Sequence, residues 1–318
     1  MIIVTGGAGF IGSNIVDALN ASNVTDILVV DRIGENFSNL NGLRFSDFMQ
    51  PDEFTRAIER DSLPHRIEAI LHQGACADTT CNDARYMMKN NFTFSKTVLH
   101  FAVARKIPLI YASSAAVYGA STAFAPTPEN ERPLNLYGFS KLAFDNHVRS
   151  LVAKSESTVA GLRYFNVYGP RESHKGKMAS MVYQLYGQLR SGGRARLFKG
   201  TDGYGDGEQR RDFIFVGDVV RVNLALADGP IRKGIFNLGT GLARSFNDVA
   251  RTAIAQIGSG AIEYIPFPTS LAGKYQSYTQ ADLSAPGHLG YMAPFVSLED
   301  GIAQSAAAWN NESAAPAG

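Results

Sequence analysis

Tyr137 and Lys141 stand four residues apart, a spacing that places both side chains on one face of a helix. A free tyrosine has a pKa of about 10, which is too high for a good base at neutral pH. A nearby ammonium stabilises the phenolate, so we expect Lys141 to lower the pKa of Tyr137. Ser114 follows the apolar run Leu109–Ala112, and its hydroxyl is expected to bond the substrate oxygen. Such a set moves a proton to or from an alcohol while another group moves a hydride.

A glycine-rich turn near the start of the chain indicates what carries the hydride. Gly6, Gly9 and Gly12 follow the apolar run Ile2–Val4 and precede a helical pattern. The first glycine allows a tight turn, the second lets the backbone approach a pyrophosphate, and the third lets the helix pack closely on the strand. The N–H groups at the helix start then bind phosphate. The turn therefore predicts a nicotinamide dinucleotide as cofactor.

The residues leave the type of dinucleotide open. Asp31 and Arg32 end the apolar run Ile27–Val30, where the adenosine ribose is expected. Asp31 favours NAD, because a 2′-phosphate would face its carboxylate. Arg32 favours NADP, because its guanidinium can pair with that phosphate through two hydrogen bonds.

Short β-branched runs alternate with helical patterns in the first half of the chain. The runs predicted as strands are Ile2–Val4, Ile27–Val30, Ala69–His72, Leu109–Ala112 and Val159–Tyr164, with helices such as Gly12–Leu19 and Tyr137–Leu151 between them. Apolar strands that alternate with helices predict an α/β protein with a doubly wound parallel sheet, the Rossmann fold. Its ligand is expected at the carboxyl ends of the strands.

The pattern changes after Tyr168. Residues 200–211 are rich in glycine and charge and are expected to form an irregular loop, followed by a strand over Asp212–Val216 and a helix from Gly217 or Asp218. We therefore expect a dinucleotide-binding domain of residues 1–168 with a returning segment at about 212–240. Residues 169–211 and about 241–310 are expected to form a smaller α/β substrate domain.

The composition is that of an ordinary soluble protein, with 318 residues, 45% hydrophobic and 19% charged. The net charge of +1 without a basic stripe argues against a nucleic-acid partner, and no apolar run approaches the roughly 18 residues of a membrane span. The first strand starts at residue 2, so we expect no signal peptide. Cys76 and Cys81 suffice neither for a disulfide framework nor for a zinc site, so we expect no metal and a reducing cytoplasm.

Several motifs together resemble the extended short-chain dehydrogenase/reductase family. They are Thr5–Gly12, Ser113–Gly119, Tyr137–Lys141 and Arg163–Arg171. Over residues 1 to about 310 the chain is most similar to members that act on an ADP-linked heptose, and the segment His174–Ser180 is the most telling part. This resemblance implies inversion of C6″ of ADP-D-glycero-D-manno-heptose for the lipopolysaccharide inner core. It also implies a cytoplasmic homo-oligomer, with a pentamer expected.

The resemblance further implies how the inversion proceeds. The secondary alcohol is oxidised by hydride transfer to bound NADP⁺ or NAD⁺, the ketone turns its other face, and the hydride returns. The oxygen occupies different places in the two stereoisomers, so two acid/base groups are needed, and these are Tyr137 and Lys175. Burial or a neighbouring cation is expected to lower the pKa of Lys175, with Arg171, His174 and Lys177 as candidate cations.

The resemblance also supplies binding residues, position by position. For the cofactor they are Gly6, Gly9, Phe10, Ile11, Gly12, Asp31, Arg32, Gln73, Gly74, Ala75, Cys76, Ala77, Asn90, Lys141, Val167 and Lys175. For the substrate they are Ser114, Asn166, Lys177, Gln184, Phe198, Lys199, Gly200, Thr201, Arg211 and Tyr275. Several residues depart from the family pattern: Arg32 stands where asparagine is common, Gln73 where glutamate is frequent, Lys177 where serine is frequent, Gln184 where histidine is frequent, and Asn36 and Pro51 where lysines are seen.

Two alternatives remain. One is another nucleotide-sugar enzyme of the same family, either a 4-epimerase of a UDP- or GDP-hexose or a 4,6-dehydratase. A dehydratase usually carries an Asp-Glu pair beside the serine, where this chain has Ala115–Ala116. The other is a cofactor-binding regulator without activity, against which the presence of Tyr137, Lys141 and Ser114 argues.

Overall fold

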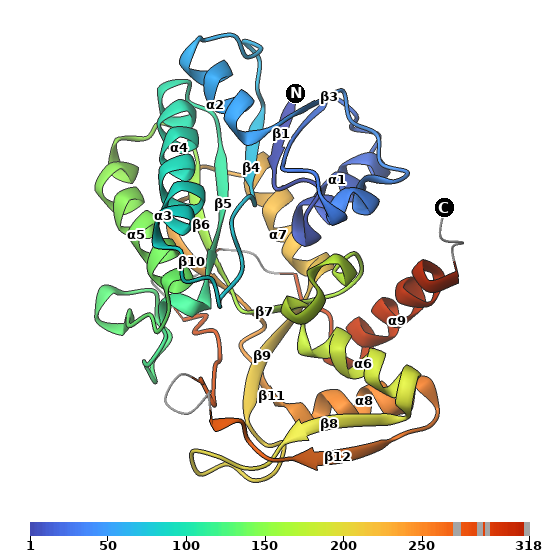
Figure 1. The fold of residues 1–318 in the computed structure, drawn as a ribbon. Helices are drawn as coiled ribbons and strands as arrows, with labels where there is room; N and C mark the ends of the chain where they lie inside the picture. Colours follow the sequence, from blue (N-terminus) through green and yellow to red (C-terminus); the bar gives the residue numbers. More distant parts are fainter. Residues whose placement is uncertain (270–274, 285–288, 290–292, 315–318) are drawn as a thin grey trace. The chain divides into compact units, whose positions relative to one another are not determined.

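The computed structural model describes residues 1–269, 275–284, 289 and 293–314, and these divide into two compact units. The first unit comprises residues 1–164 and 219–237 with the described part of 283–291. The second comprises residues 165–218 and 238–282 with the described part of 292–318. Figure 1 shows the elements of both units, each of which is described by itself.

The first unit is built on a seven-stranded sheet in the order β10-β6-β5-β4-β1-β2-β3. All pairs from β6 through to β3 are parallel. The strands are β1 (Ile2–Thr5), β2 (Ile27–Val30), β3 (Asp47–Met49), β4 (Ala69–His72), β5 (Leu109–Ser114), β6 (Val159–Tyr164) and β10 (Lys233–Leu238). The predicted doubly wound α/β fold is confirmed, and five strands lie where the β-branched runs predict them. The two edge strands, β3 and β10, were not predicted, and β3 has only three residues, too few for a recognisable apolar run.

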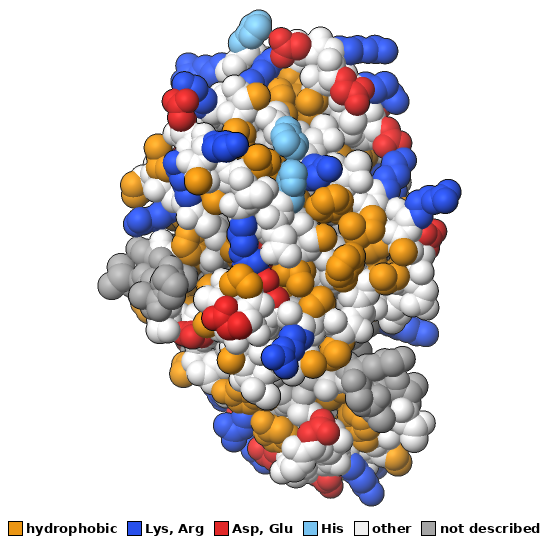
Figure 2. All heavy atoms as spheres, turned by 90° about the vertical axis from the view of Figure 1, so that its left-hand side faces the viewer, with side chains coloured by type: hydrophobic (Ala, Val, Ile, Leu, Met, Phe, Trp, Pro, Cys, Tyr) orange, Lys and Arg blue, Asp and Glu red, His pale blue; other side chains and the backbone are white. Residues whose placement is uncertain are grey.

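Helices cover both faces of this sheet, with α1 and α7 on one side and α4 and α5 on the other (Figure 1). The helices are α1 (Phe10–Ala21), α2 (Pro51–Glu59), α3 (Ala84–Met88), α4 (Phe94–Ala104), α5 (Leu136–Leu151) and α7 (Val216–Asp228). The core beneath α4 and α5 includes the fully buried Ile70, Val98, Leu109 and Val148. Parallel strands are apolar on both faces for this reason. The outward side of these helices carries mixed hydrophobic, charged and histidine side chains (Figure 2).

In its described residues the second unit has two small sheets and the three α-helices α6, α8 and α9. One sheet has the order β11-β9-β7, in which β7 and β9 are parallel and β9 and β11 antiparallel. The other pairs β8 and β12 in parallel. The elements are β7 (Asn166–Tyr168), β8 (Arg194–Phe198), β9 (Arg210–Phe215), β11 (Ala243–Ser245), β12 (Ala261–Ile265), α6 (Met181–Gly192), α8 (Phe246–Ile257) and α9 (Leu298–Ala314).

Strand β9 and helix α7 begin slightly earlier than predicted, β9 at Arg210 instead of Asp212 and α7 at Val216 instead of Gly217 or Asp218. The return to the first unit comes later than the expected residue 212. Because β9 pairs with β7 and β11, it belongs to the second unit, and the first unit resumes at Val219. In the described part of the chain, no helix is long and apolar enough to cross a membrane.

Candidate active site

The glycine-rich turn between β1 and α1 leaves no room for side chains. Gly6 adopts φ +68°, a left-handed conformation that residues with a Cβ disfavour. A Cβ on Gly6 would lie 2.6 Å from the backbone nitrogen of Gly74, and one on Gly12 would lie 2.0 Å from the carbonyl oxygen of Gly6. Among the described residues no side chain caps α1 at Gly9. A tight turn that leads into an uncapped helix N-terminus fits the pyrophosphate of a dinucleotide.

A pocket of about 190 Å³ lies beside this turn. Asp31 stands at its edge, and its carboxylate accepts hydrogen bonds from the backbone N–H groups of Ala8 (2.8 Å) and Arg32 (2.7 Å). Burial raises the pKa of Asp31, which these hydrogen bonds partly offset. The Arg32 guanidinium lies 6.0 Å from the centroid of the Tyr86 ring. The predicted cofactor residues that line this pocket are Gly6, Asp31, Arg32, Gly74, Ala75, Cys76 and Asn90.

In the segment after β4, the side chain of Gln73 and the backbone of Cys76 are hydrogen-bonded to other protein groups. The Gln73 amide accepts a hydrogen bond from the Tyr164 hydroxyl (2.9 Å) and donates one to Asn223 (3.1 Å), so it is held by protein groups. Cys76 is held by Asn91, whose amide accepts from the Cys76 N–H (2.7 Å) and donates to the Cys76 carbonyl (2.9 Å). Ala77 is exposed and does not line the pocket.

Asn91 also connects this segment to α5. Its amide donates to the Ser140 hydroxyl (3.0 Å), which in turn donates to the Tyr137 carbonyl (2.7 Å). Sequence reasoning assigned a role to Asn90 and none to Asn91. The buried position of Asn91 at a helical interior depends on tertiary packing and leaves no local signal.

The predicted serine, tyrosine and lysine lie together in the first unit. Helix α5 begins after Asn135, whose side chain accepts a hydrogen bond from the Gly138 N–H and caps the helix. The Lys141 ammonium lies 5.9 Å from the centroid of the Tyr137 ring and donates a hydrogen bond to the Ala112 carbonyl (2.8 Å). Ser114 is the last residue of β5, and its side chain is hydrogen-bonded to that of Tyr137.

The electrostatics of this cluster differ from the sequence expectation. Burial lowers the pKa of Lys141 to about 8, with the nearby Asp145 opposing that change. Burial also raises the pKa of Tyr137, and the hydrogen bond with Ser114 only partly offsets the effect. The expectation that Lys141 lowers the pKa of Tyr137 is therefore wrong for the protein alone. A buried phenol loses hydration of its anion, and an ammonium engaged with a carbonyl does not compensate that loss.

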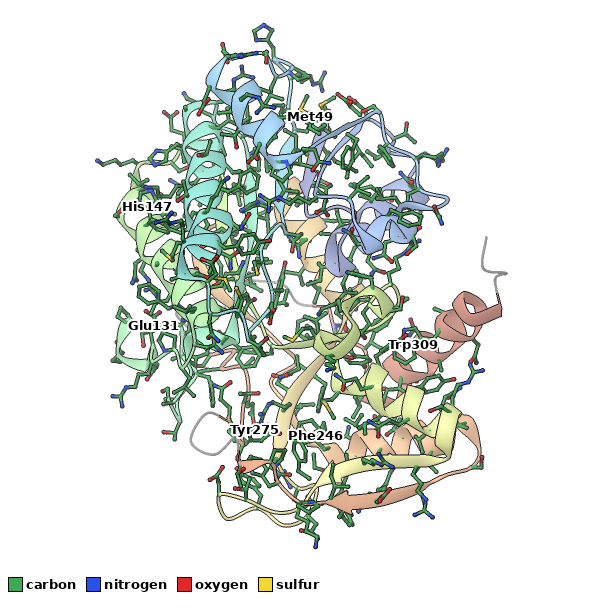
Figure 3. The ribbon with its side chains drawn as sticks, viewed as in Figure 1. Met49, Glu131, His147, Phe246, Tyr275 and Trp309 are labelled. Atoms are coloured by element: carbon green, nitrogen blue, oxygen red, sulfur yellow. The ribbon has the colours of Figure 1, made fainter. Side chains whose placement is uncertain are left out.

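Arg163, Asp145 and Glu131 form a buried ionic network next to this cluster, and the sequence analysis did not predict it. Arg163 has no exposed side-chain surface and donates to Asp145 (3.0 Å) and to Glu131, which is labelled in Figure 3. Asp145 also accepts hydrogen bonds from Tyr111 (2.9 Å) and Ser113 (2.9 Å). Since Asp145 lies one turn after Lys141 and Ser113 directly precedes Ser114, the network joins α5 to the end of β5.

Lys175 lies in the second unit, on a short 3-10 helix spanning Ser173–Met178. Burial lowers the pKa of Lys175, and the charge of Glu172 opposes the change. The predicted cations Arg171, His174 and Lys177 are not its cause, so burial alone accounts for the direction. Lys177 is exposed, and the Gln184 amide donates to the carbonyls of Lys177 (3.2 Å) and Ala179 (2.7 Å).

Three predicted substrate residues, Phe198, Arg211 and Tyr275, gather elsewhere in the second unit. The Arg211 guanidinium lies 4.9 Å from the Tyr275 ring centroid and 5.7 Å from that of Phe246, and Figure 3 shows these two rings close together. The ring centroids of Phe198 and Tyr275 lie 6.4 Å apart. Arg211 is 8% exposed, and its partners among the described residues are these rings and the Arg210 carbonyl, none of them a carboxylate.

The remaining predicted residues are dispersed. Asn166 donates to the Asp212 carbonyl (3.2 Å), and Val167 follows it in β7. Lys199 follows β8, and Gly200 and Thr201 begin the predicted loop, where the Gly200 N–H donates to the Asp206 carboxylate (2.8 Å). Phe10 is buried and Ile11 half-buried at the start of α1, and neither lines the cofactor pocket. Within the described ranges, no group of three or more His, Cys, Asp or Glu side chains is placed to hold a metal ion.

Known proteins resemble this chain along nearly its whole length. Residues 2–239 match the NAD dependent epimerase/dehydratase family. A protein of Alkalilimnicola ehrlichii named ADP-L-glycero-D-manno-heptose-6-epimerase is 54% identical over 304 residues, which cover 95% of this chain and 95% of the relative.

Solved structures agree with that similarity. The crystal structure of Helicobacter pylori ADP-L-glycero-D-manno-heptose-6-epimerase is 34% identical, with a TM-score of 0.82 and coverage of 96% of this chain and 95% of the other. A UDP-glucose 4-epimerase of Thermotoga maritima, solved with UDP-glucose, is 29% identical, with a TM-score of 0.80 and coverage of 98% and 99%.

Proposed function

This chain belongs to the NAD dependent epimerase/dehydratase family, and we propose that it inverts C6″ of ADP-D-glycero-D-manno-heptose to give the L-glycero isomer. The observation that carries the proposal is the Ser114–Tyr137–Lys141 cluster in a chain that also holds the half-buried Lys175. The first set handles the proton of a secondary alcohol, and Lys175 supplies a second acid/base group. An epimerase needs both, because the alcohol oxygen changes place when the carbon inverts.

Each residue has a role in this proposal. In one direction Tyr137 takes the hydroxyl proton of the starting stereoisomer and Lys175 gives a proton to the oxygen of the inverted one, and the two groups exchange roles in the reverse direction, while Ser114 bonds the reacting oxygen. Burial lowers the pKa of Lys175, which makes its neutral amine more accessible. Lys141 holds the cofactor ribose and provides a positive charge beside the tyrosine ring. The nicotinamide, when bound, supplies the acceptor and donor of the hydride.

NADP is the cofactor that we propose, with NAD as the alternative. The support lies in how the two discriminating residues are engaged. Both oxygens of Asp31 already accept backbone N–H bonds, which spread its charge toward the turn. Arg32 is stacked beside Tyr86 at the pocket and carries a fork suited to a 2′-phosphate. Equilibrium titration with both dinucleotides tests this assignment, and a higher affinity for NAD would contradict it.

The ADP part of the substrate is assigned to the second unit. Arg211 is a buried cation whose described neighbours are rings and a carbonyl, which suits a diphosphate that brings the missing negative charge. Phe198 and Tyr275 offer aromatic faces to a base. Asn166, Lys177, Gln184 and the segment Lys199–Thr201 complete the proposed substrate residues.

NMR of the purified protein mixed with ADP-D-glycero-D-manno-heptose tests the function, with the configuration at C6″ followed over time. We expect an equilibrium mixture of the two isomers, without added cofactor if the protein retains its own. UDP-glucose and a GDP-hexose serve as controls, because the related 4-epimerase structures make a hexose the main alternative. Conversion of a hexose at C4 with no change of the heptose would contradict the proposal.

We further propose that the enzyme works in the cytoplasm as a homo-oligomer, with a pentamer as the expected state. The free thiols of Cys76 and Cys81 fit a reducing compartment. Light scattering coupled to size-exclusion chromatography gives the mass of the assembly, and a monomer at micromolar concentration would contradict this assignment.

A further inference from the structure

One buried carboxylate, that of Glu172, joins the two ends of the segment Gly169–Ser180, which carries Lys175. Glu172 has no exposed surface, and its side chain accepts hydrogen bonds from the Gly169 N–H (3.0 Å), the Ser180 N–H (2.5 Å) and the Ser180 hydroxyl (2.8 Å). These donors stand at the two ends of the segment. A single side chain therefore joins the end of β7 to the start of α6, with Lys175 on the loop between them.

This backbone holds conformations that side chains rarely adopt. Arg171 has φ +69°, Gly169 has φ +148° and Gly176 has φ +50°. A non-glycine residue at positive φ is held there only where surrounding contacts over-determine it. The Lys175 N–H donates to the Glu172 carbonyl (3.0 Å), so Glu172 holds the segment through its backbone as well as through its side chain.

The same carboxylate also acts on the charge of Lys175. Glu172 and His174 are titratable groups that face it. Burial raises the pKa of Glu172 and lowers the pKa of Lys175, and each charge opposes the shift of the other. Burial lowers the pKa of His174, which is therefore neutral at pH 7 and adds no competing charge. Glu172 is the group that favours the ammonium.

We propose that Glu172 is a positioning residue, which fixes Lys175 for proton transfer by joining both ends of the segment Gly169–Ser180. This inference rests on the proposed function of Lys175 and adds the group that acts through it. Glu172 itself touches no reacting atom: its hydrogen bonds go to the backbone and to Ser180.

Two variants separate placement from charge. Glu172→Asp keeps the charge but shortens the side chain, so it cannot reach both ends of the segment. We expect kcat to fall about tenfold at unchanged KM, since even a small misplacement of an acid/base group is costly. Glu172→Gln removes the charge and faces an amide toward N–H donors, and we expect a larger loss. Glu263→Gln removes an exposed carboxylate from the same unit and serves as the matched control.

The protonation of Lys175 is measured independently of activity. Lysines are reductively methylated with ¹³C-formaldehyde, and the Lys175 resonance is identified by its absence in Lys175→Arg. The midpoint of its NMR titration should move to lower pH in Glu172→Gln, because the charge that favours the ammonium is gone. It should stay in place in Glu172→Asp and in Glu263→Gln. Whichever limb of the kcat–pH profile Lys175 sets should move with the midpoint.

The outcomes distinguish this inference from the proposed function. A wild-type kcat in Glu172→Asp together with an unmoved Lys175 midpoint in Glu172→Gln would overturn the positioning role. A wild-type protein that leaves the heptose unchanged would overturn the function, while the NMR titration still reports on Glu172. If Glu172→Gln does not fold, Glu172→Asp decides alone: wild-type kcat rejects the role, and a tenfold loss with a wild-type circular dichroism spectrum supports it.

Discussion

Each unit holds one lysine whose pKa burial lowers, the buried Lys141 in the first and the half-buried Lys175 in the second, and they hold it in different ways. In the first unit Lys141 projects from the long helix α5, and Asp145 on the next turn is shared with Arg163, Tyr111 and Ser113. In the second unit Lys175 lies on an irregular segment whose support is the carboxylate of Glu172 bonded mainly to backbone. A regular element supplies position by itself, whereas an irregular one needs a dedicated side chain to hold it.

The largest expected effect tests whether the two units are equal partners in proton transfer. Tyr137→Phe and Lys175→Met should each reduce kcat by about 10²–10⁴, the usual contribution of a positioned acid/base group. The measurement is the rate of C6″ inversion followed by NMR, with Lys177→Met as the matched control on the same segment. A near-normal rate in Lys175→Met would show that Lys175 takes no part in proton transfer and that the two units are not equal partners in it.

The buried ionic network near Lys141 should contribute more to the free energy of unfolding than the hydrogen bonds of Glu172 near Lys175. Arg163→Met leaves the buried Asp145 without its paired cation and Glu131 with Arg149 alone, and the free energy of unfolding should fall by about 3–5 kcal/mol. Urea denaturation measures this change. Arg149→Met, which removes a more exposed partner of Glu131, should cost much less. Equal losses in the two variants would show that the network is not held together by its buried arginine.

Much of the first unit follows from local sequence, and much of the second does not. The β-branched runs, the turn at Gly6 and the pair Tyr137 and Lys141 are short-range signals, so five of the seven strands of the sheet and the helices α1 and α5 were predictable. The direction of the Tyr137 pKa was not, because it depends on burial that spacing cannot reveal. Glu172 was missed for the same reason: its donors come from both ends of a folded segment.

We expect the lowered pKa of Lys141 to appear in the pH–activity profile as a limb on the alkaline side, where activity falls. With its pKa near 8, Lys141 loses its charge as the pH rises, and the cation beside the Tyr137 ring is lost. Activity should therefore fall about tenfold for each pH unit well above that value. Lys141→Arg keeps its charge throughout, so this limb should disappear from its profile. A limb that stays at the same pH in Lys141→Arg would assign it to another group.

The smallest expected effect concerns the cofactor pocket of the first unit. Arg32→Ala should lower the affinity for NADP about tenfold and leave that for NAD almost unchanged, since a charge-assisted hydrogen bond contributes about 1.5–3 kcal/mol. Fluorescence titration of cofactor-free protein with both dinucleotides gives the two affinities. Arg44→Ala, an arginine bonded to Asn20, is the control. Equal losses for both dinucleotides would remove Arg32 as the discriminating residue.

The hydrogen bonds of Asn91 have a thermodynamic consequence. One amide bridges the cofactor-side segment at Cys76 and the helix that carries Tyr137 and Lys141. Binding that orders the segment at Cys76 should therefore also make local unfolding of α5 less frequent, because the segment and the helix open together as one cooperative unit. Cofactor binding would then slow amide hydrogen exchange in α5, remote from the pyrophosphate turn. An enzyme whose cofactor ends each turnover as it began gains from such linkage, because a dinucleotide that stiffens the catalytic helix is also one that leaves slowly.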